Sequence, residues 1–307
     1  MDAVPLVRKG LIARLNLGRR LVLGVPYVWL TLFFLVPLVI VFGISFSTPK
    51  IAMPPIEPLL SYGADKVVQL RLYLSNYTFI ADDNLYLDAF ANSVKVAAIS
   101  TFLALLLGYP MAYGIARAPR NWRSVLFLLV VLPFFTSFLL RVYAWIALLS
   151  RNGPINAVLL KFGLIHEPLV MLQTDFAVYL GMVYSYLPFM VLPLYSAIEK
   201  LDPSLLEAAA DLGCRPTKAF FRVTLPLTSE GILAGCLLVF IPSVGEYVIP
   251  ALLGGPGTLM IGRVLWEEFF NNRDWPLASA VAVLLLLLLV GFIVALQRVQ
   301  NREAASE

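Results

Sequence analysis

Six long apolar segments constrain this 307-residue chain more than any other feature of its sequence. A helix that crosses the hydrocarbon core of a bilayer needs about 20 mostly apolar residues. Segments that meet this requirement lie at residues 21–46, 93–116, 124–149, 176–198, 231–253 and 277–297. The composition agrees, because 60% of the residues are apolar and only 14% are charged, against about 25% charged residues in soluble proteins. We therefore predict an all-α polytopic membrane protein with six transmembrane helices.

The distribution of lysine and arginine predicts the orientation of these helices, because positively charged loops resist translocation. With the N-terminus in the cytoplasm, fourteen such residues fall within 69 cytoplasmic residues, and seven fall within 95 residues on the opposite face. Both termini are therefore expected in the cytoplasm. The basic stretch within residues 1–20 is expected to lie on anionic lipid head groups; it does not indicate nucleic acid as a partner.

The loop at residues 199–230 carries helix signals of its own. Asp202 precedes a proline, which is typical of a helix N-terminus, and Gly213 is typical of the left-handed residue that ends a helix. Pro216 can begin a second short helix. We name residues 202–223 the bracket. One face of its first helix carries residues at helical spacing, namely Leu205, Ala208, Ala209 and Leu212. This face either receives a partner or packs against the membrane ends of the same chain.

The bracket also carries a recognisable motif, which reads Glu207-Ala208-Ala209, Gly213, Val223 and Leu225-Pro226. It resembles the EAA signature of permease subunits in binding-protein-dependent ABC importers, with valine at a position usually held by isoleucine. The resemblance implies a type I importer permease fold. It also implies that Glu207, Ala208, Ala209 and Gly213 belong to a coupling helix seated in a cleft of the ATP-binding subunit. Leu225 is expected outside helical geometry because it precedes proline, and Leu225 and Pro226 are expected to set the angle of the fifth span.

Further resemblance narrows the family. Residues 97–110, 137–145 and 241–280 look like polyamine importer permeases, especially the putrescine branch, and the likeness extends from about residue 25 to about residue 290. It implies a multi-pass protein of the bacterial inner membrane that forms half of a translocation pathway by alternating access. The implied partners are a homologous second permease subunit, two ATP-binding subunits and a periplasmic polyamine-binding protein. A spermidine-preferring permease, or one for another organic cation, is the alternative within this class.

This resemblance completes the expected domain organisation. The chain should comprise a basic cytoplasmic segment at 1–20, a first transmembrane helix at 21–46, a periplasmic segment at 47–92, an importer permease core with five transmembrane helices at 93–297 and a cytoplasmic tail at 298–307. The loop at 199–230 is the coupling loop within that core.

The sequence contains no recognisable means of hydrolysing ATP. No G-x4-G-K-[ST] phosphate-binding loop is present, so ATP and Mg²⁺ are expected on the partner ATPase and no cofactor is expected on this chain. A single histidine, His166, and two cysteines indicate no metal centre and no catalytic residues. The chain is therefore expected to be a translocation subunit and not an enzyme. A secondary transporter would need inverted repeats with paired broken helices, and we find no such repeat.

Three charges lie within the predicted spans, where an ionisable group is costly. Lys95 lies near the outer end of its span, from which its side chain is expected to reach the interface, so Arg141 and Glu246 are the two that require an explanation. On straight helices, Arg141 lies about 25 Å above the start of the third span and Glu246 about 23 Å above the start of the fifth. The two could form a structural ion pair. Alternatively, Glu246 lines a cation pathway, and Pro242 bends the helix beside it. Aromatic residues are candidate cation–π partners along such a pathway, although most membrane aromatics serve packing or interfacial roles; they are Tyr143, Trp145, Tyr184, Tyr186 and Phe189.

Overall fold

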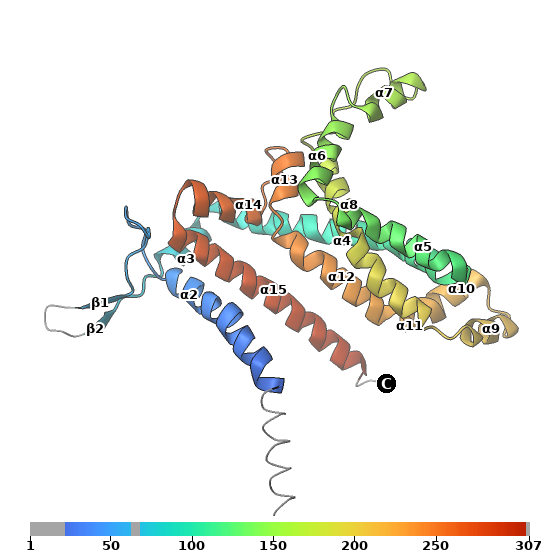
Figure 1. The fold of residues 1–307 in the computed structure, drawn as a ribbon, viewed down its shortest axis with the longest axis horizontal. Helices are drawn as coiled ribbons and strands as arrows, with labels where there is room; N and C mark the ends of the chain where they lie inside the picture. The colour runs from blue at the N-terminus through green and yellow to red at the C-terminus, as the bar shows by residue number, and fades with distance from the viewer. Residues whose placement is uncertain (1–21, 63–67, 305–307) are drawn as a thin grey trace, which may run out of the picture. The chain divides into compact units, whose positions relative to one another are not determined.

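The computed structural model describes residues 22–62 and 68–304, which divide into two compact units (Figure 1). The first unit combines Met1–Ile80 with Glu268–Glu307, and the second is Ala81–Glu267. The predicted basic segment at 1–20 lies outside the described residues. Helices predominate among the described residues, and their only named strands form one small hairpin, which confirms the predicted all-α fold class.

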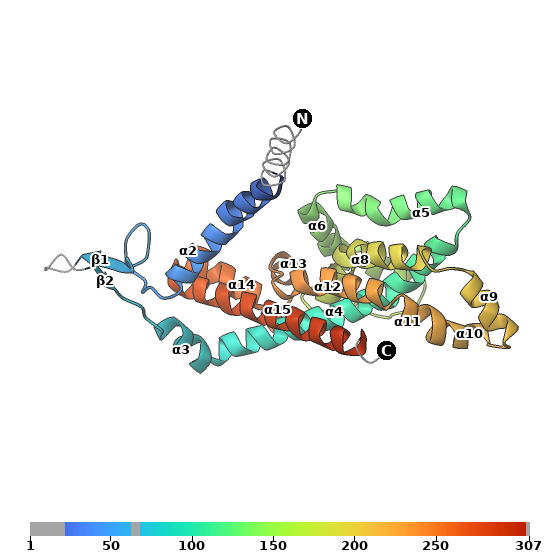
Figure 2. The same cartoon turned by 90° about the horizontal axis from the view of Figure 1, so that it is seen from below.

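Three helices form the centre of the second unit: α4 (Asn84–Arg117), α8 (Asp175–Glu199) and α12 (Ser229–Val244). They pack side by side (Figures 1 and 2). Buried alanines of α4, such as Ala104 and Ala112, face larger buried side chains of α8, such as Met190 and Leu194. Small residues allow helix backbones to approach closely in a membrane, where packing and not hydrophobic burial holds helices together.

The predicted third span is broken in the structure. It comprises α5 (Arg120–Val131), a 3₁₀ turn at Leu132–Phe135 and α6 (Phe138–Leu149). The runs Arg120–Phe135 and Phe138–Lys161 meet at 92°. The prediction of one continuous helix at 124–149 was therefore wrong. Pro133 has no N–H to continue the helix, and the Thr136 hydroxyl donates to the Pro133 carbonyl at 2.7 Å, where the chain turns into extended geometry.

A second bend lies in the predicted coupling loop, just before the predicted fifth span at 231–253. The helical run Pro216–Leu227 meets α12 at 67°, and the intervening residue, Thr228, has ψ near 8°. The predicted fifth span is itself discontinuous, because α12 stops at Val244 and a short helix, α13 (Val248–Leu253), follows after three residues. Counting each bent pair as one span, the described residues contain up to six candidate spans.

The remaining elements of the second unit flank this centre. They are α7 (Pro154–Lys161), α9 (Ser204–Asp211), α10 (Pro216–Ala219), a π-helical turn at Phe220–Thr224, α11 (Leu225–Leu227) and α14 (Ile261–Trp266). Within this unit the bracket lies at one end of α12, and α13 lies at the other (Figure 1).

The first unit contains two apolar helices. The span Val22–Ile44 includes a π-helical turn at Thr31–Leu35 and α2 (Val36–Ile44), and α2 packs against α15 (Trp275–Ala304). A π-helical turn at Glu267–Asn271 precedes α15. The unpredicted hairpin pairs β1 (Leu60–Tyr62) antiparallel to β2 (Val68–Leu70), and α3 (Ser75–Asp82) follows. Buried Asn76 holds the end of the first span, because its amide donates to the carbonyls of Ser45 and Ser47 at 2.9 and 2.8 Å.

Candidate functional site

The first helix of the bracket forms as its sequence signals predict. The Asp202 carboxylate accepts the Ser204 N–H at 2.9 Å, and this hydrogen bond lowers the pKa of the Asp202 carboxyl below its usual value. Gly213 has φ +74°. The Gly213 and Cys214 amides donate back to the carbonyls of Ala210 and Ala209 at 2.8 and 2.9 Å. Both ends of α9 are thus capped by local bonds, so the helix does not depend on packing for its ends.

The predicted apolar face of α9 is largely uncovered. Leu212 is 88% exposed and Leu205 is 44% exposed, and Glu207 and Ala208 are exposed as well. Ala209 is half-buried. Self-packing against the membrane ends therefore does not cover this face among the described residues, and the face remains available to a partner.

Just beyond the bracket, the chain differs from the prediction at Leu225. That residue has φ −63° and ψ −46°, which is helical geometry, so the expectation of a break before Pro226 was wrong. The helix widens to a π-turn just before the proline, and the Leu225 N–H donates to Phe220, five residues back. A wider turn at this point accommodates the proline ring, which would otherwise clash with the preceding carbonyls. The chain bends at Thr228 instead, where the hydroxyl bonds to the Thr224 carbonyl and to the Tyr109 hydroxyl.

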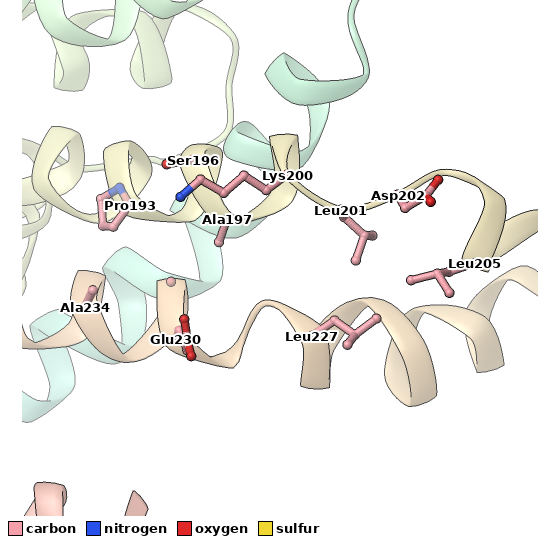
Figure 3. Close-up of a pocket in the computed structure, with 11 residues that line it drawn as sticks. Pro193, Ser196, Ala197, Lys200, Leu201, Asp202, Leu205, Leu227, Glu230 and Ala234 are labelled. Carbon is pink, nitrogen blue, oxygen red and sulfur yellow. The ribbon is translucent and has the colours of Figure 1, made fainter. Parts of the chain in front are cut away.

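A pocket of about 510 Å³ lies beside the base of the bracket (Figure 3). One wall is the end of α8, with Lys200, and the opposite wall is the start of α12, with Glu230. Leu201, Asp202 and Leu205 lie at the end of the pocket next to the bracket (Figure 3). The pocket separates the entry of the bracket from α12 and leaves it room to tilt.

Glu246 lies in the unwound stretch between α12 and α13. Its carboxylate accepts the backbone N–H groups of Val248 and Ile249 at 2.9 and 3.4 Å, which caps α13. The other carboxylate oxygen accepts the hydroxyl of Tyr186, from α8. We expected Pro242 to bend the helix, but α12 continues through this proline and ends two residues later, at Val244. Unwound backbone inside a membrane is tolerated where it is buried in protein or lines a cavity.

Helices α4 and α14 hold this stretch from the other side. The Ser93 hydroxyl accepts the Ile261 N–H at 2.8 Å, and the Asn92 amide donates to the Leu259 carbonyl at 2.9 Å. These bonds fix the start of α14 against α4. A Cβ added at Gly262 would come within 2.8 Å of the Glu246 carbonyl oxygen. The backbone around Glu246 is therefore set by close packing against α14.

Arg141 does not pair with Glu246. None of the ion pairs among the described residues joins them, and the guanidinium of Arg141 lies 5.6 and 5.7 Å from the ring centres of Phe134 and Phe138. The expected pairing assumed that both residues rise along straight helices. The 92° bend in the third span invalidates that assumption.

The predicted aromatic residues separate into two groups and one isolated side chain. Tyr186 contacts Phe189 with ring centres 6.3 Å apart, and Phe189 meets Phe134 edge-on at 5.2 Å. Trp145 and Tyr184 form a separate edge-on pair at 5.3 Å. Tyr143 is 58% exposed.

Sequence reasoning missed Phe134 and Phe138, which lie on the two sides of the break in the third span. Pro133 was the available signal, because a proline inside an apolar segment predicts a break. We name the contiguous series Phe134, Phe189, Tyr186 and Glu246 the aromatic–carboxylate series. It connects the break in the third span to the break in the fifth.

Comparison with known protein families gives one match over most of the chain. The family described as "Binding-protein-dependent transport system inner membrane component" matches residues 100–303. Two relatives are each named "Spermidine/putrescine transport system permease protein PotB". The protein from Haemophilus influenzae is 38% identical over 295 residues, which cover 95% of this chain and 98% of that protein. The protein from Escherichia coli K12 is 41% identical over 261 residues, which cover 85% and 90% of the two chains.

Solved structures agree on the fold. A bacterial ABC transporter involved in the import of the acidic polysaccharide alginate superposes with a TM-score of 0.71, covering 94% of this chain and 98% of that chain. The "MetNI methionine ABC transporter" superposes with a TM-score of 0.53. Sequence identities of 16% and 17% limit both likenesses to the fold.

Proposed function

The chain belongs to the family of binding-protein-dependent transport system inner membrane components, and from this membership we propose that it is the permease subunit of an ATP-driven polyamine importer. The observation that carries the substrate class is the match to two proteins named as spermidine/putrescine permeases, one of which covers 95% of the chain. The proposed location is the bacterial inner membrane, with both termini in the cytoplasm.

The proposed assembly contains four kinds of partner. A second, homologous permease completes the pathway, two ATP-binding subunits hold ATP and Mg²⁺, a periplasmic binding protein delivers the polyamine, and lipid surrounds the spans. Support comes from the bracket, whose exposed leucines and alanines offer an apolar surface for a groove on the ATP-binding subunit.

In the proposed mechanism, closure of the ATPase pair moves the bracket and thereby switches the permease between inward- and outward-facing states. Glu207, Ala208, Ala209 and Gly213 would contact the ATPase. Leu225 and Pro226 would transmit the movement, since their helical geometry joins the bracket to the bend at Thr228. The pocket beside Lys200 and Glu230 provides space for this tilt.

Glu246 is the proposed acceptor for an ammonium group of the substrate. A carboxylate offers about four lone-pair positions, and Glu246 accepts hydrogen bonds from three donors among the described residues. Phe189 and Tyr186 would present ring faces to the rest of the cation. Trp145 and Tyr184 form a second aromatic candidate, and Tyr143 is the most exposed member of the proposed pathway.

Within the polyamine class we propose putrescine as the preferred substrate. The names of both relatives include spermidine and putrescine, so they support the class and leave the preference to experiment. This preference follows from the resemblance of residues 97–110, 137–145 and 241–280 to the putrescine branch of these permeases.

The experiment is uptake of labelled putrescine by the complete complex in ATP-loaded proteoliposomes, with unlabelled spermidine, amino acids and sugars as competitors. Only polyamines should compete. Glu246→Gln removes the charge at constant shape and should lower uptake at least tenfold, whereas Glu246→Asp should keep partial activity. Competition by a sugar or an amino acid, or normal uptake in Glu246→Gln, would contradict the proposal.

A further inference from the structure

Arg141 is almost fully buried, being only 8% exposed, and it lacks an anionic partner among the described residues. Its Nε and Nη1 atoms have no hydrogen-bond acceptor. The guanidinium instead lies over the ring faces of Phe134 and Phe138. Leaving a buried charge without an acceptor is strongly unfavourable, so an arginine held only by rings is held weakly compared with one in an ion pair.

The two rings lie on opposite sides of the break in the third span. Phe134 belongs to the 3₁₀ turn that ends the first part, and Phe138 is the first residue of α6. Because Arg141 contacts both rings, its guanidinium connects the two sides of the 92° bend. Breaking these contacts would remove a restraint on the angle between the two parts.

Phe134 is also the member of the aromatic–carboxylate series that lies farthest along it from Glu246. It meets Phe189, which meets Tyr186, whose hydroxyl donates to Glu246. A cation that moves from Glu246 along these rings would come to the ring that Arg141 already occupies. An ammonium group and a guanidinium group recognise the same negative face of an aromatic ring.

We propose that Arg141 is a tethered competitor of the substrate: its guanidinium occupies the Phe134 and Phe138 rings in the empty permease, and a substrate ammonium group takes its place at Phe134 and releases the bend. This inference rests on the proposed function, because it takes the transported solute to be a polyamine. It makes Arg141 a positioning residue that links substrate arrival to the angle of the third span, and it explains why a buried cation persists in a pathway for cations.

The test uses the complete complex in proteoliposomes with saturating binding protein and three variants. Arg141→Gln removes the competing charge, and Arg141→Lys keeps it. Phe138→Leu removes one of the two rings that hold the guanidinium and leaves the aromatic–carboxylate series unaltered. The measurements are KM and maximal rate of putrescine uptake, together with ATP hydrolysis in the absence of substrate.

Arg141→Gln and Phe138→Leu should lower the KM for putrescine by about fivefold and raise substrate-independent ATP hydrolysis several-fold, whereas Arg141→Lys should stay close to the wild type. An unchanged KM and unchanged basal hydrolysis in both Arg141→Gln and Phe138→Leu would overturn the inference, as would a lysine variant that matches the glutamine variant. If Arg141→Gln does not assemble, Phe138→Leu decides alone.

The two proposals fail in different ways. A wild-type complex that takes up no polyamine refutes the proposed function. A wild-type complex that transports putrescine, with variants whose KM and basal hydrolysis are unchanged, refutes only the role of Arg141.

Discussion

At the residue scale, Gly213 determines how the two helices of the bracket meet. Its φ of +74° lies in the left-handed region, which β-branched side chains avoid and asparagine tolerates. A Cβ added there would meet no atom within 4 Å. Any effect of substitution therefore comes from the backbone and not from a steric clash with the rest of the chain.

This geometry predicts opposite results for two substitutions. Gly213→Val should reduce ATP-driven uptake at least tenfold, because valine distorts the turn, while Gly213→Asn should retain most of it. Uptake and the amount of permease in the membrane are measured side by side. Equal uptake by the two variants, at equal amounts in the membrane, would show that uptake does not depend on the left-handed geometry at residue 213.

The sequence was least sufficient for predicting which side chains contact each other. Glu246 and Tyr186 were both expected along the pathway, but the hydrogen bond between them depends on how α8 meets the end of α12. An ion pair with Arg141 was one of the two expectations for Glu246, and it was wrong. The choice of partner depends on tertiary geometry that residue type does not contain.

At the scale of elements, apolar length predicted where the spans lie and failed to predict where they break. The pattern of 124–149 is equally apolar on both sides of residues 136 and 137, so hydrophobicity carries no signal for the 92° bend. Proline was an ambiguous guide. Pro133 precedes a true break, whereas α12 passes through Pro242 and the helix before Pro226 adapts by widening. Whether a proline breaks a helix depends on which neighbouring groups satisfy the freed carbonyls.

Close packing of α14 against the unwound stretch yields a stability prediction. A Cβ at Gly262 would overlap the carbonyl oxygens of Gly245 and Glu246, so Gly262→Ala should destabilise the permease by about 1–3 kcal/mol. Gly114 lies within α4 and has no atom within 4 Å of an added Cβ. Gly114→Ala should therefore be neutral or stabilise by up to about 1 kcal/mol.

Thermal unfolding of the detergent-solubilised complex compares the two variants. Gly262→Ala should unfold at a lower temperature than the wild type, and Gly114→Ala should not. If both alanine variants shift the unfolding midpoint equally, close contact between α14 and the stretch around Glu246 does not contribute to the stability of the permease.

At the scale of the whole molecule, the family and the helical fold could be identified from the sequence. The EAA-like motif supplied the family, and the match to residues 100–303 confirmed it. The hairpin at Leu60–Tyr62 and Val68–Leu70 escaped prediction, because its strands are three residues long and lie in a proline-rich stretch with little periodic pattern.

The central claim is that an ATP-binding subunit moves this permease through the bracket. The most direct test places the photoreactive residue benzoylphenylalanine at Leu212, which is 88% exposed at the end of α9. A matched control places it at Phe162, which is 73% exposed at the end of α7. After illumination of the complete complex, the account predicts a covalent adduct with the ATP-binding subunit from position 212 and none from position 162. An adduct from position 162, or position 212 linked only to lipid or to the binding protein, would contradict it.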